Sequence, residues 1–167
     1  IPDTVPLTRG SRGCVVVRNN IIKQLKNYVK LKETPILIFD QIKYGTAEEH
    51  QQKKQEIESY LDSWKTAWQS QKIDSYMNFY DPSFTAPGFD FEGWKKHKSG
   101  LKYQFVKVDI LNPLILTHKD QLYIKFIQKY QSDLHKDEGI KTIYALKNGS
   151  TYKIVREEWA GISGREE

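Results

Sequence analysis

The sequence predicts an α+β protein, in which helices come first and a curved antiparallel sheet follows. Apolar residues recur at helical spacing over residues 57–68, whereas residues 103–159 alternate in short strand-like runs. The dipeptide Asn148-Gly149 separates the last two runs and favours a two-residue hairpin loop with positive φ at both turn positions. Helices that precede a series of strands are typical of a layered α+β fold.

A length of 167 residues corresponds to one ordinary domain, or to one small domain plus a fragment of another. Hydrophobic residues at 38% and aromatic residues at 13% allow a core that is built largely on rings. No apolar run approaches the roughly 20 residues that a membrane span needs, so no span is expected. Cys14 is the single cysteine, so an internal disulfide is excluded. The net charge of +5 is compatible with acidic partners. The lysines are scattered along the sequence, however, which favours an ordinary solvated surface over a binding site for such partners.

The first part of the chain is expected to contain little regular structure. Residues 1–13 are predicted to form a loop, because prolines and glycines interrupt any periodic pattern. A brief strand over 15–17, a helix capped by Asn19 or Asn20, and a buried strand over 36–44 should follow. We therefore expect a domain boundary near residue 46.

The second part, residues 47–167, begins with helices. One long helix should bury a face of Ile57, Tyr60, Leu61, Trp64 and Trp68. A shorter helix carries Ile73, Met77 and Tyr80 and ends at Asp81-Pro82; a third covers 91–97. Strands are predicted over 103–110, 115–118, 122–132, 140–146 and 152–159.

The tetrapeptide Ser11-Arg12-Gly13-Cys14 has the features of a nucleophilic site. A reactive thiolate needs exposure and nearby positive charge, and Arg9, Arg12 and Arg18 supply that charge. Gly13 lets the backbone approach a reacting carbonyl, so main-chain N–H groups there could stabilise an oxyanion. The alternative is that Cys14 is a buried thiol in an unrelated fragment.

These residues resemble the active-site signature of the YkuD-type L,D-transpeptidases, which is Ser/Thr-x-Gly-Cys followed by Ile or Val. The resemblance covers residues 1–46. It implies a cysteine acyl-enzyme that acts on peptidoglycan stem peptides and passes the acyl group to an amine or to water. It also implies a location in the periplasm or cell envelope.

The sequence departs from this family at two points. The family has Arg two residues after the Cys, where this chain has Val16, and Arg18 is the candidate substitute. The family's general base is a His in an upstream His-Gly pair, and no His precedes Cys14. Because a Cys without its base is a poor nucleophile, we expect the chain alone to be inactive. The chain begins with Ile1 rather than Met, which suggests a mature or truncated form with the base encoded further upstream.

Residues 47–167 resemble the NTF2-like superfamily, a cone of helices wrapped by a bent antiparallel sheet. The resemblance rests on Trp64-x-x-x-Trp68, on Tyr76-x-x-x-Tyr80 followed by Phe84, on Trp94, and on the runs 126–133 and 153–159. The order of the two resemblances is that of L,D-carboxypeptidases which carry an NTF2-like domain after the catalytic one. The cone of many relatives holds a pocket, for which the candidates are Tyr76, Tyr80, Trp94, Gln128, Tyr130, Lys141 and Glu158.

Rings beside a few polar groups suit a sugar or a peptide carboxylate, so a glycan or a stem peptide is the expected partner. Alternatively the aromatic residues are core, which we favour for Trp64 and Trp68, while Gln128, Lys141 and Glu158 could equally lie on the surface.

The sequence is compatible with three functions. The first is a cysteine L,D-carboxypeptidase or L,D-transpeptidase, and the second is a non-enzymatic module that binds a glycan, stem peptide or protein. The third, nucleic-acid binding, is disfavoured because no basic stripe is visible. A His–Asp pair in the cone, from His97 or His118 with Asp109 or Asp120, is also disfavoured. No metal or cofactor is expected, because no paired His/Cys spacing occurs. A homodimer is compatible with the apolar surface that an incomplete catalytic domain would expose.

Overall fold

A computed structural model describes residues 16–30, 34–39, 41 and 44–162. The chain divides into two compact units, Ile1–Tyr44 and Gly45–Glu167.

The described part of the first unit contains one helix, α1 (Asn19–Leu25). The predicted strands are wrong where they can be checked: Val16 and Val17 are not in a strand, nor are residues 36–39. The side chains of Ile36 and Ile38 are 73% and 74% exposed. A buried strand needs a neighbour for its backbone and a cover for its side chains, and the described residues of this unit supply neither. Ser11, Arg12, Gly13 and Cys14 lie outside the described residues.

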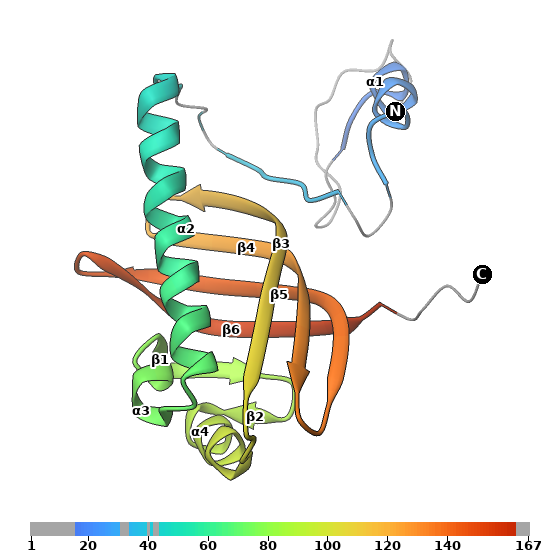
Figure 1. The fold of residues 1–167 in the computed structure, drawn as a ribbon. Coiled ribbons are helices and arrows are strands. Elements are labelled where there is room, and N and C mark those ends of the chain that lie inside the picture. The colour runs from blue at the N-terminus through green and yellow to red at the C-terminus, as the bar shows by residue number, and fades with distance from the viewer. Residues whose placement is uncertain (1–15, 31–33, 40, 42–43, 163–167) are drawn as a thin grey trace. The chain divides into compact units, whose positions relative to one another are not determined.

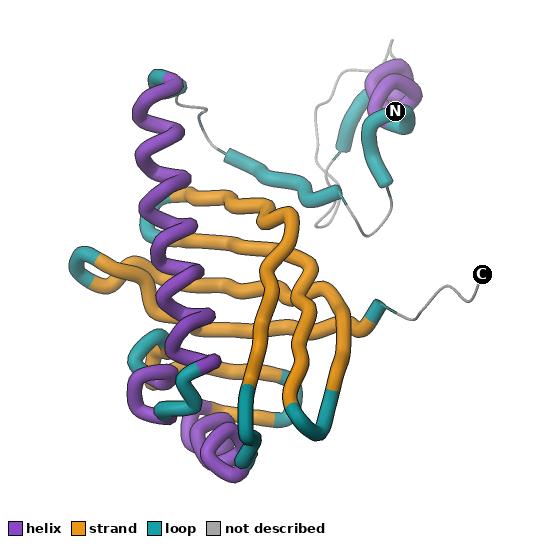
Figure 2. Tube along the Cα trace, viewed as in Figure 1, coloured by secondary structure: helices purple, strands orange, loops and turns teal. Residues whose placement is uncertain are grey.

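The second unit is built on one bent six-stranded sheet, in the order β2-β1-β6-β5-β4-β3 (Figure 1). The strands β3 to β6 form a continuous antiparallel meander. Figure 2 shows these four strands as a broad surface that the long helix over residues 47–69 crosses. The strands are β1 (Tyr80–Ala86), β2 (Phe89–Asp90), β3 (Val106–His118), β4 (Gln121–Ser132), β5 (Lys136–Asn148) and β6 (Thr151–Gly161).

Two of these strands were not predicted. Tyr80, expected at the end of a helix, is the first residue of β1, because helix α3 (Ile73–Met77) ends earlier. β1 pairs in parallel with β6, a partner far along the chain that local sequence cannot reveal. Pro82 is tolerated in β1 because the pairing with β6 is irregular between Tyr80 and Thr85.

The remaining strands match the prediction with two changes. The two runs expected over 103–110 and 115–118 form a single strand, β3, with an irregularity near Asn112, whose φ is 51°. The hairpin at Asn148-Gly149 exists, but Asn148 pairs with Thr151. The loop is therefore residues 149–150, and of these only Gly149 has a positive φ, of 62°.

Helix α2 (Ala47–Gln69) crosses the inner face of the sheet and builds the core. It begins at a capping box, in which the Thr46 hydroxyl accepts from the Glu49 N–H and the Glu49 carboxylate accepts from the Thr46 N–H. Its buried face, Ile57, Leu61 and Trp64, packs against the alternating inward residues of the sheet. These are Leu122, Ile124, Phe126, Ile143, Ala145, Tyr152 and Ile154.

Gly139 on β5 allows a close approach of β6. A β-carbon there would lie 2.5 Å from the carbonyl oxygen of Ala160 and 2.6 Å from the Trp159 ring. We expect Gly139→Ala to lower the free energy of unfolding by roughly 1–3 kcal/mol, because β6 must move. Urea unfolding measures this. Gly100→Ala is the control, since its β-carbon meets nothing within 4 Å. An equal effect of both substitutions would contradict the packing argument.

Candidate ligand-binding site

The second unit has a cavity of ≈ 490 Å³ at one end of the cone, which we call the mouth cavity. Its walls come from α2, the β1–β2 hairpin, helix α4 (Phe91–Gly100), the segment after α4, and the strands β4 to β6. Asp90 is the N-cap of helix α4, and its carboxylate accepts a hydrogen bond from the Gly93 N–H at 2.8 Å. The lining residues are Trp68, Ala86, Pro87, Phe89, Trp94, His97, Lys98, Leu101, Tyr103, Gln128, Tyr130, His135, Asp137, Lys141, Glu157, Glu158 and Trp159.

Five of the seven residues predicted to line a pocket meet in this cavity. Gln128 and Tyr130 on β4, Lys141 on β5 and Trp94 on α4 all line it, together with Glu158. The predicted alternation on β4 is confirmed, because every second residue from Leu122 to Ser132 is buried. Whether these residues bind a ligand stays a prediction.

The other two, Tyr76 and Tyr80, lie in a buried polar network beneath the cavity. Glu157 is its centre: one carboxylate oxygen accepts from Lys141 Nζ at 2.7 Å and the other from the Tyr80 hydroxyl at 2.5 Å. The Tyr80 oxygen also receives the Trp64 indole N–H at 3.1 Å and is hydrogen-bonded to the Tyr76 hydroxyl. Burial, and then the charge of Glu157, raises the pKa of both tyrosines, so both remain donors.

Glu157 was missed because of a bulge in β6. Pairing with β5 places Ile154 opposite Ala145 and Arg156 opposite Tyr144, so Val155 is an extra residue. The extra residue shifts the alternation, and Glu157 rather than Arg156 faces inward. Glu158 lines the rim and pairs with Arg156 at 2.5 Å. The ion pair between Lys141 on β5 and Glu157 on β6 could be predicted only if the register between these two strands were known.

Gln128 presents an unsatisfied polar group in this cavity. Its side chain is 3% exposed, and its Oε1 atom has no hydrogen-bond partner among the described residues. Leaving a buried amide oxygen unpaired costs about 1–3 kcal/mol, so the position favours a ligand that donates a hydrogen bond. Tyr130 beside it stays protonated, because burial raises its pKa to about 12.

Lys98 on α4 is the cation that sequence reasoning missed. Its ammonium nitrogen lies 4.6 Å from the ring centroid of Trp68 and 4.6 Å from that of Trp94. Among the residues that the structure describes, no carboxylate lies within ion-pair distance of it. Burial and the charge of Lys141 lower the pKa of Lys98 to about 8. The only sequence signal was the Trp94–Lys98 spacing of one helical turn, within a helix that otherwise reads as a solvated lysine-rich face.

The His–Asp pair at the cavity differs from the pairs considered from sequence. His135 Nε2 lies 3.0 Å from Asp137 Oδ2 at the rim. His97 lines the cavity by packing on Phe89 and Trp94 instead. Asp109 pairs with Lys107 on β3.

The described residues contain neither a metal-binding cluster nor a membrane-spanning helix. No group of three or more His, Cys, Asp or Glu side chains there is placed to hold a metal ion. None of the helices in the described segments has the length and apolar character to cross a membrane.

The family model of the Cds6 C-terminal NTF2-like domain matches residues 56–158. The chain belongs to this family. The predicted α+β, NTF2-like fold of helices and a curved sheet is thereby confirmed. No curated protein matches the chain.

Many solved structures are similar to this chain, among them the following three. Bd1075 from Bdellovibrio bacteriovorus is 54% identical at a TM-score of 0.93, over 99% of this chain and 60% of Bd1075. The chain thus spans about three fifths of that protein's length. The helical cell shape determining protein Pgp2 from Campylobacter jejuni is 22% identical at a TM-score of 0.68, over 87% of this chain and 53% of Pgp2. The association domain of CaMKII from C. elegans is 15% identical at 0.55, over 68% of this chain and 98% of that domain.

The last two similarities show a shared fold alone. Because the fold also serves as an association domain, a homodimer is compatible with it and stays a prediction. The L,D-transpeptidase interpretation of residues 1–46 also stays a prediction.

Removal of one partner of the Glu157–Lys141 pair should strongly destabilise the fold, because the two side chains are only 2% and 7% exposed. Glu157→Gln leaves the Lys141 ammonium buried without a counter-charge, so we expect a loss of about 3–5 kcal/mol in urea unfolding. Combining it with Lys141→Met removes both charges and should recover much of this loss. A double variant that is less stable than Glu157→Gln alone would contradict this account.

Lys98 should cost stability at neutral pH. The unfolded chain binds more protons between pH 8 and 10.5 than the folded one, because the pKa of Lys98 in the folded protein is about 8 against its ordinary value of 10.5. Lys98→Met should therefore raise the free energy of unfolding at pH 7 by about 1 kcal/mol, and this gain should shrink as pH rises through that window. Thermal melts from pH 7 to 10 measure it, with Lys96→Met on the same helix as control. The other titratable groups that face Lys98 are those of Lys141 and Asp137 on β5, Glu157 on β6 and His97 on α4. A gain that does not change with pH would contradict the low pKa.

Proposed function

We propose that residues 45–167 bind peptidoglycan stem peptides for a cell-envelope cysteine enzyme, whose nucleophile is Cys14. The observation that carries the proposal is the mouth cavity, which combines aromatic walls with a buried amide oxygen and a lysine that have no hydrogen-bond or carboxylate partner, respectively, among the described residues. The cell-shape description of Pgp2 supports a peptidoglycan context for this chain, and so does the resemblance of Ser11-Arg12-Gly13-Cys14 to the L,D-transpeptidase signature.

The cavity suits a ligand with amide groups, apolar portions and a carboxylate. Trp94, Trp159 and Tyr130 offer ring faces on which a sugar or a short aliphatic side chain can pack. Gln128 Oε1 can accept the N–H of a peptide bond. Lys98 can pair with a carboxylate, whereas Lys141 is already neutralised by Glu157. A stem peptide carries all three kinds of group.

In the proposed reaction the Cys14 thiolate attacks the carbonyl carbon of the last peptide bond of the stem. The tetrahedral oxyanion collapses, the terminal amino acid leaves as the protonated amine, and a thioester remains on Cys14. Hydrolysis of this thioester frees the shortened stem and the thiolate, which is a carboxypeptidase reaction. The L,D-transpeptidase resemblance implies that a His outside the four of this chain accepts the thiol proton. Gly13 would supply a backbone N–H to the oxyanion, with Ser11, Arg12 and Arg18 around it.

A binding module without catalysis is the second candidate function. It is favoured by the state of the buried groups: Glu157, the most buried carboxylate of the cavity, is tied to Lys141 and Tyr80 and is no free base. The domain would then hold a glycan or stem peptide and leave the chemistry to another protein.

Mass spectrometry of muropeptides separates these candidates. We expect the full-length protein to remove the terminal amino acid of tetrapeptide stems, and its Cys14→Ala variant to lose this activity by at least about a thousandfold. New cross-linked dimers would identify a transpeptidase instead.

Binding is measured separately on the 167-residue chain by calorimetry with disaccharide-tetrapeptide. Gln128→Leu should weaken binding about tenfold, because the amide acceptor is lost. Binding without turnover in the full-length protein would support the second candidate. If wild-type protein neither binds nor cleaves, both candidate functions are wrong.

A further inference from the structure

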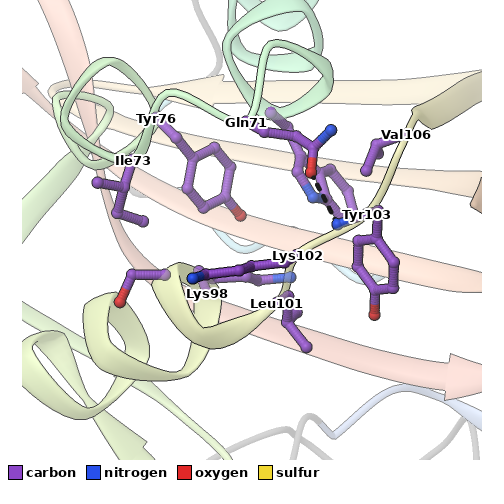
Figure 3. A pocket seen from close by; sticks show the side chains of 10 residues that line it. Gln71, Ile73, Tyr76, Lys98, Leu101, Lys102, Tyr103 and Val106 are labelled. Carbon is purple, nitrogen blue, oxygen red and sulfur yellow. Dashed lines mark hydrogen bonds between the residues drawn. The ribbon is translucent and has the colours of Figure 1, made fainter.

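A second cavity of ≈ 430 Å³ adjoins the mouth cavity. It lies between α3, α4 and the end of α2, and Figure 3 shows its lining side chains. It shares Trp68, Lys98, Leu101 and Tyr103 with the mouth cavity, so one ligand can reach both. The side chain of Lys98 is part of the wall between them.

The two cavities differ in charge. The second cavity is lined by two lysines, Lys98 and Lys102, and by no acidic residue. The mouth cavity contains three carboxylates, of Asp137, Glu157 and Glu158. Within the described part of the chain, neither Lys98 nor Lys102 is in an ion pair. The second cavity is therefore where an anion meets positive charge without opposing negative charge.

The walls of the second cavity are held in place by the protein itself. Gln71, at the end of α2, has a left-handed backbone with a φ of 57°. Its Oε1 atom accepts a hydrogen bond from the Tyr103 N–H at 3.2 Å, which Figure 3 draws as a dashed line. This bond ties the segment after α4, which carries Lys102, to the end of α2. The cavity is thus a built feature in which Tyr76 and Tyr103 flank the lysines.

Lys98 gains most from an anion. Its ammonium group is removed from water by Trp68 and Trp94, whose rings offer a weaker interaction than a carboxylate. The repulsion from Lys141 adds to this cost. A carboxylate placed between Lys98 and Lys102 would supply the missing counter-charge.

We propose that the second cavity binds a carboxylate of the ligand, through Lys98 and Lys102, while the rest of the ligand lies in the mouth cavity. This inference rests on the proposed function for the identity of the ligand, and it adds the orientation in which the stem peptide lies in the two cavities. The free carboxyl terminus of the stem points toward α3, and the sugar end points toward β5 and β6. It also makes the domain selective for stems with a free carboxylate over amidated stems.

The test compares two probes by calorimetry at pH 7: a disaccharide-tripeptide with free carboxylates, and the same molecule with its carboxylates amidated. Wild-type protein should bind the free form about tenfold more tightly, since charge-assisted hydrogen bonds are lost on amidation. The double variant Lys98→Gln/Lys102→Gln should bind both forms equally. The matched control Lys96→Gln, which removes a lysine from the same helix outside both cavities, should keep the preference. Thermal melts confirm that each variant is folded.

The outcomes separate this inference from the proposed function. Equal binding of both probes by wild-type protein, or a preference that survives in the double variant, would overturn the second-cavity site and leave the stem-peptide proposal standing. A third titration uses N-acetyl-D-alanine and follows the amide signals of Lys102 and Tyr103 by NMR. Shifts there without binding of either muropeptide would keep the carboxylate site and contradict the proposed function. No binding of any probe contradicts both, and tighter binding of inorganic phosphate than of N-acetyl-D-alanine would overturn the assignment to a carboxylate.

Discussion

The interior of the cone depends on how one buried carboxylate is neutralised. Glu157 projects from β6 into the space that α2 and the sheet enclose, where an isolated charge would be very unfavourable. Lys141, Tyr80, and through Tyr80 the Trp64 and Tyr76 side chains, satisfy it. The network joins α2, α3, β1, β5 and β6, so hydrogen bonds to one buried carboxylate hold five elements together at the floor of the mouth cavity.

The same network determines which lysine is available to a ligand. Lys141 and Lys98 both line the mouth cavity, yet Lys141 has its counter-charge at 2.7 Å, whereas the ammonium group of Lys98 faces aromatic rings and no carboxylate of the described residues. The two lysines therefore have different roles: Lys141 neutralises the buried Glu157 carboxylate, whereas Lys98 lies at the boundary of two cavities with no carboxylate partner among the described residues. An aromatic cage can hold such a cation because ring faces attract it without cancelling its charge.

The sequence predicted what depends on neighbours close in the chain. The α2 face with Ile57, Leu61 and Trp64, and the alternation that turns Gln128 and Tyr130 inward, follow from periodicity alone. Glu157 could not be found, because a single extra residue in β6 reverses the alternation after Ile154. β1 was missed because its pairing with β6 is formed by tertiary contact. Lys98 was missed because charge on a short lysine-rich helix looks solvated until the position of the Trp68 ring is known.

The way in which β1, one wall of the mouth cavity, joins the sheet has a consequence for biosynthesis. β1 joins the sheet only through β6, as Tyr80 pairs with Ile154 and the Ile154 N–H donates to the Phe79 carbonyl. The hairpin β1–β2 and helix α4 leave the ribosome long before β6 is made, and they have no docking strand until then. A nascent chain can thus bury α2 against early strands, but it completes the mouth cavity, whose lining includes Glu157, Glu158 and Trp159, only after its final strand is made. Such a non-local closure is a slow event in folding, and a ribosome that stops before β6 releases a domain without a ligand site.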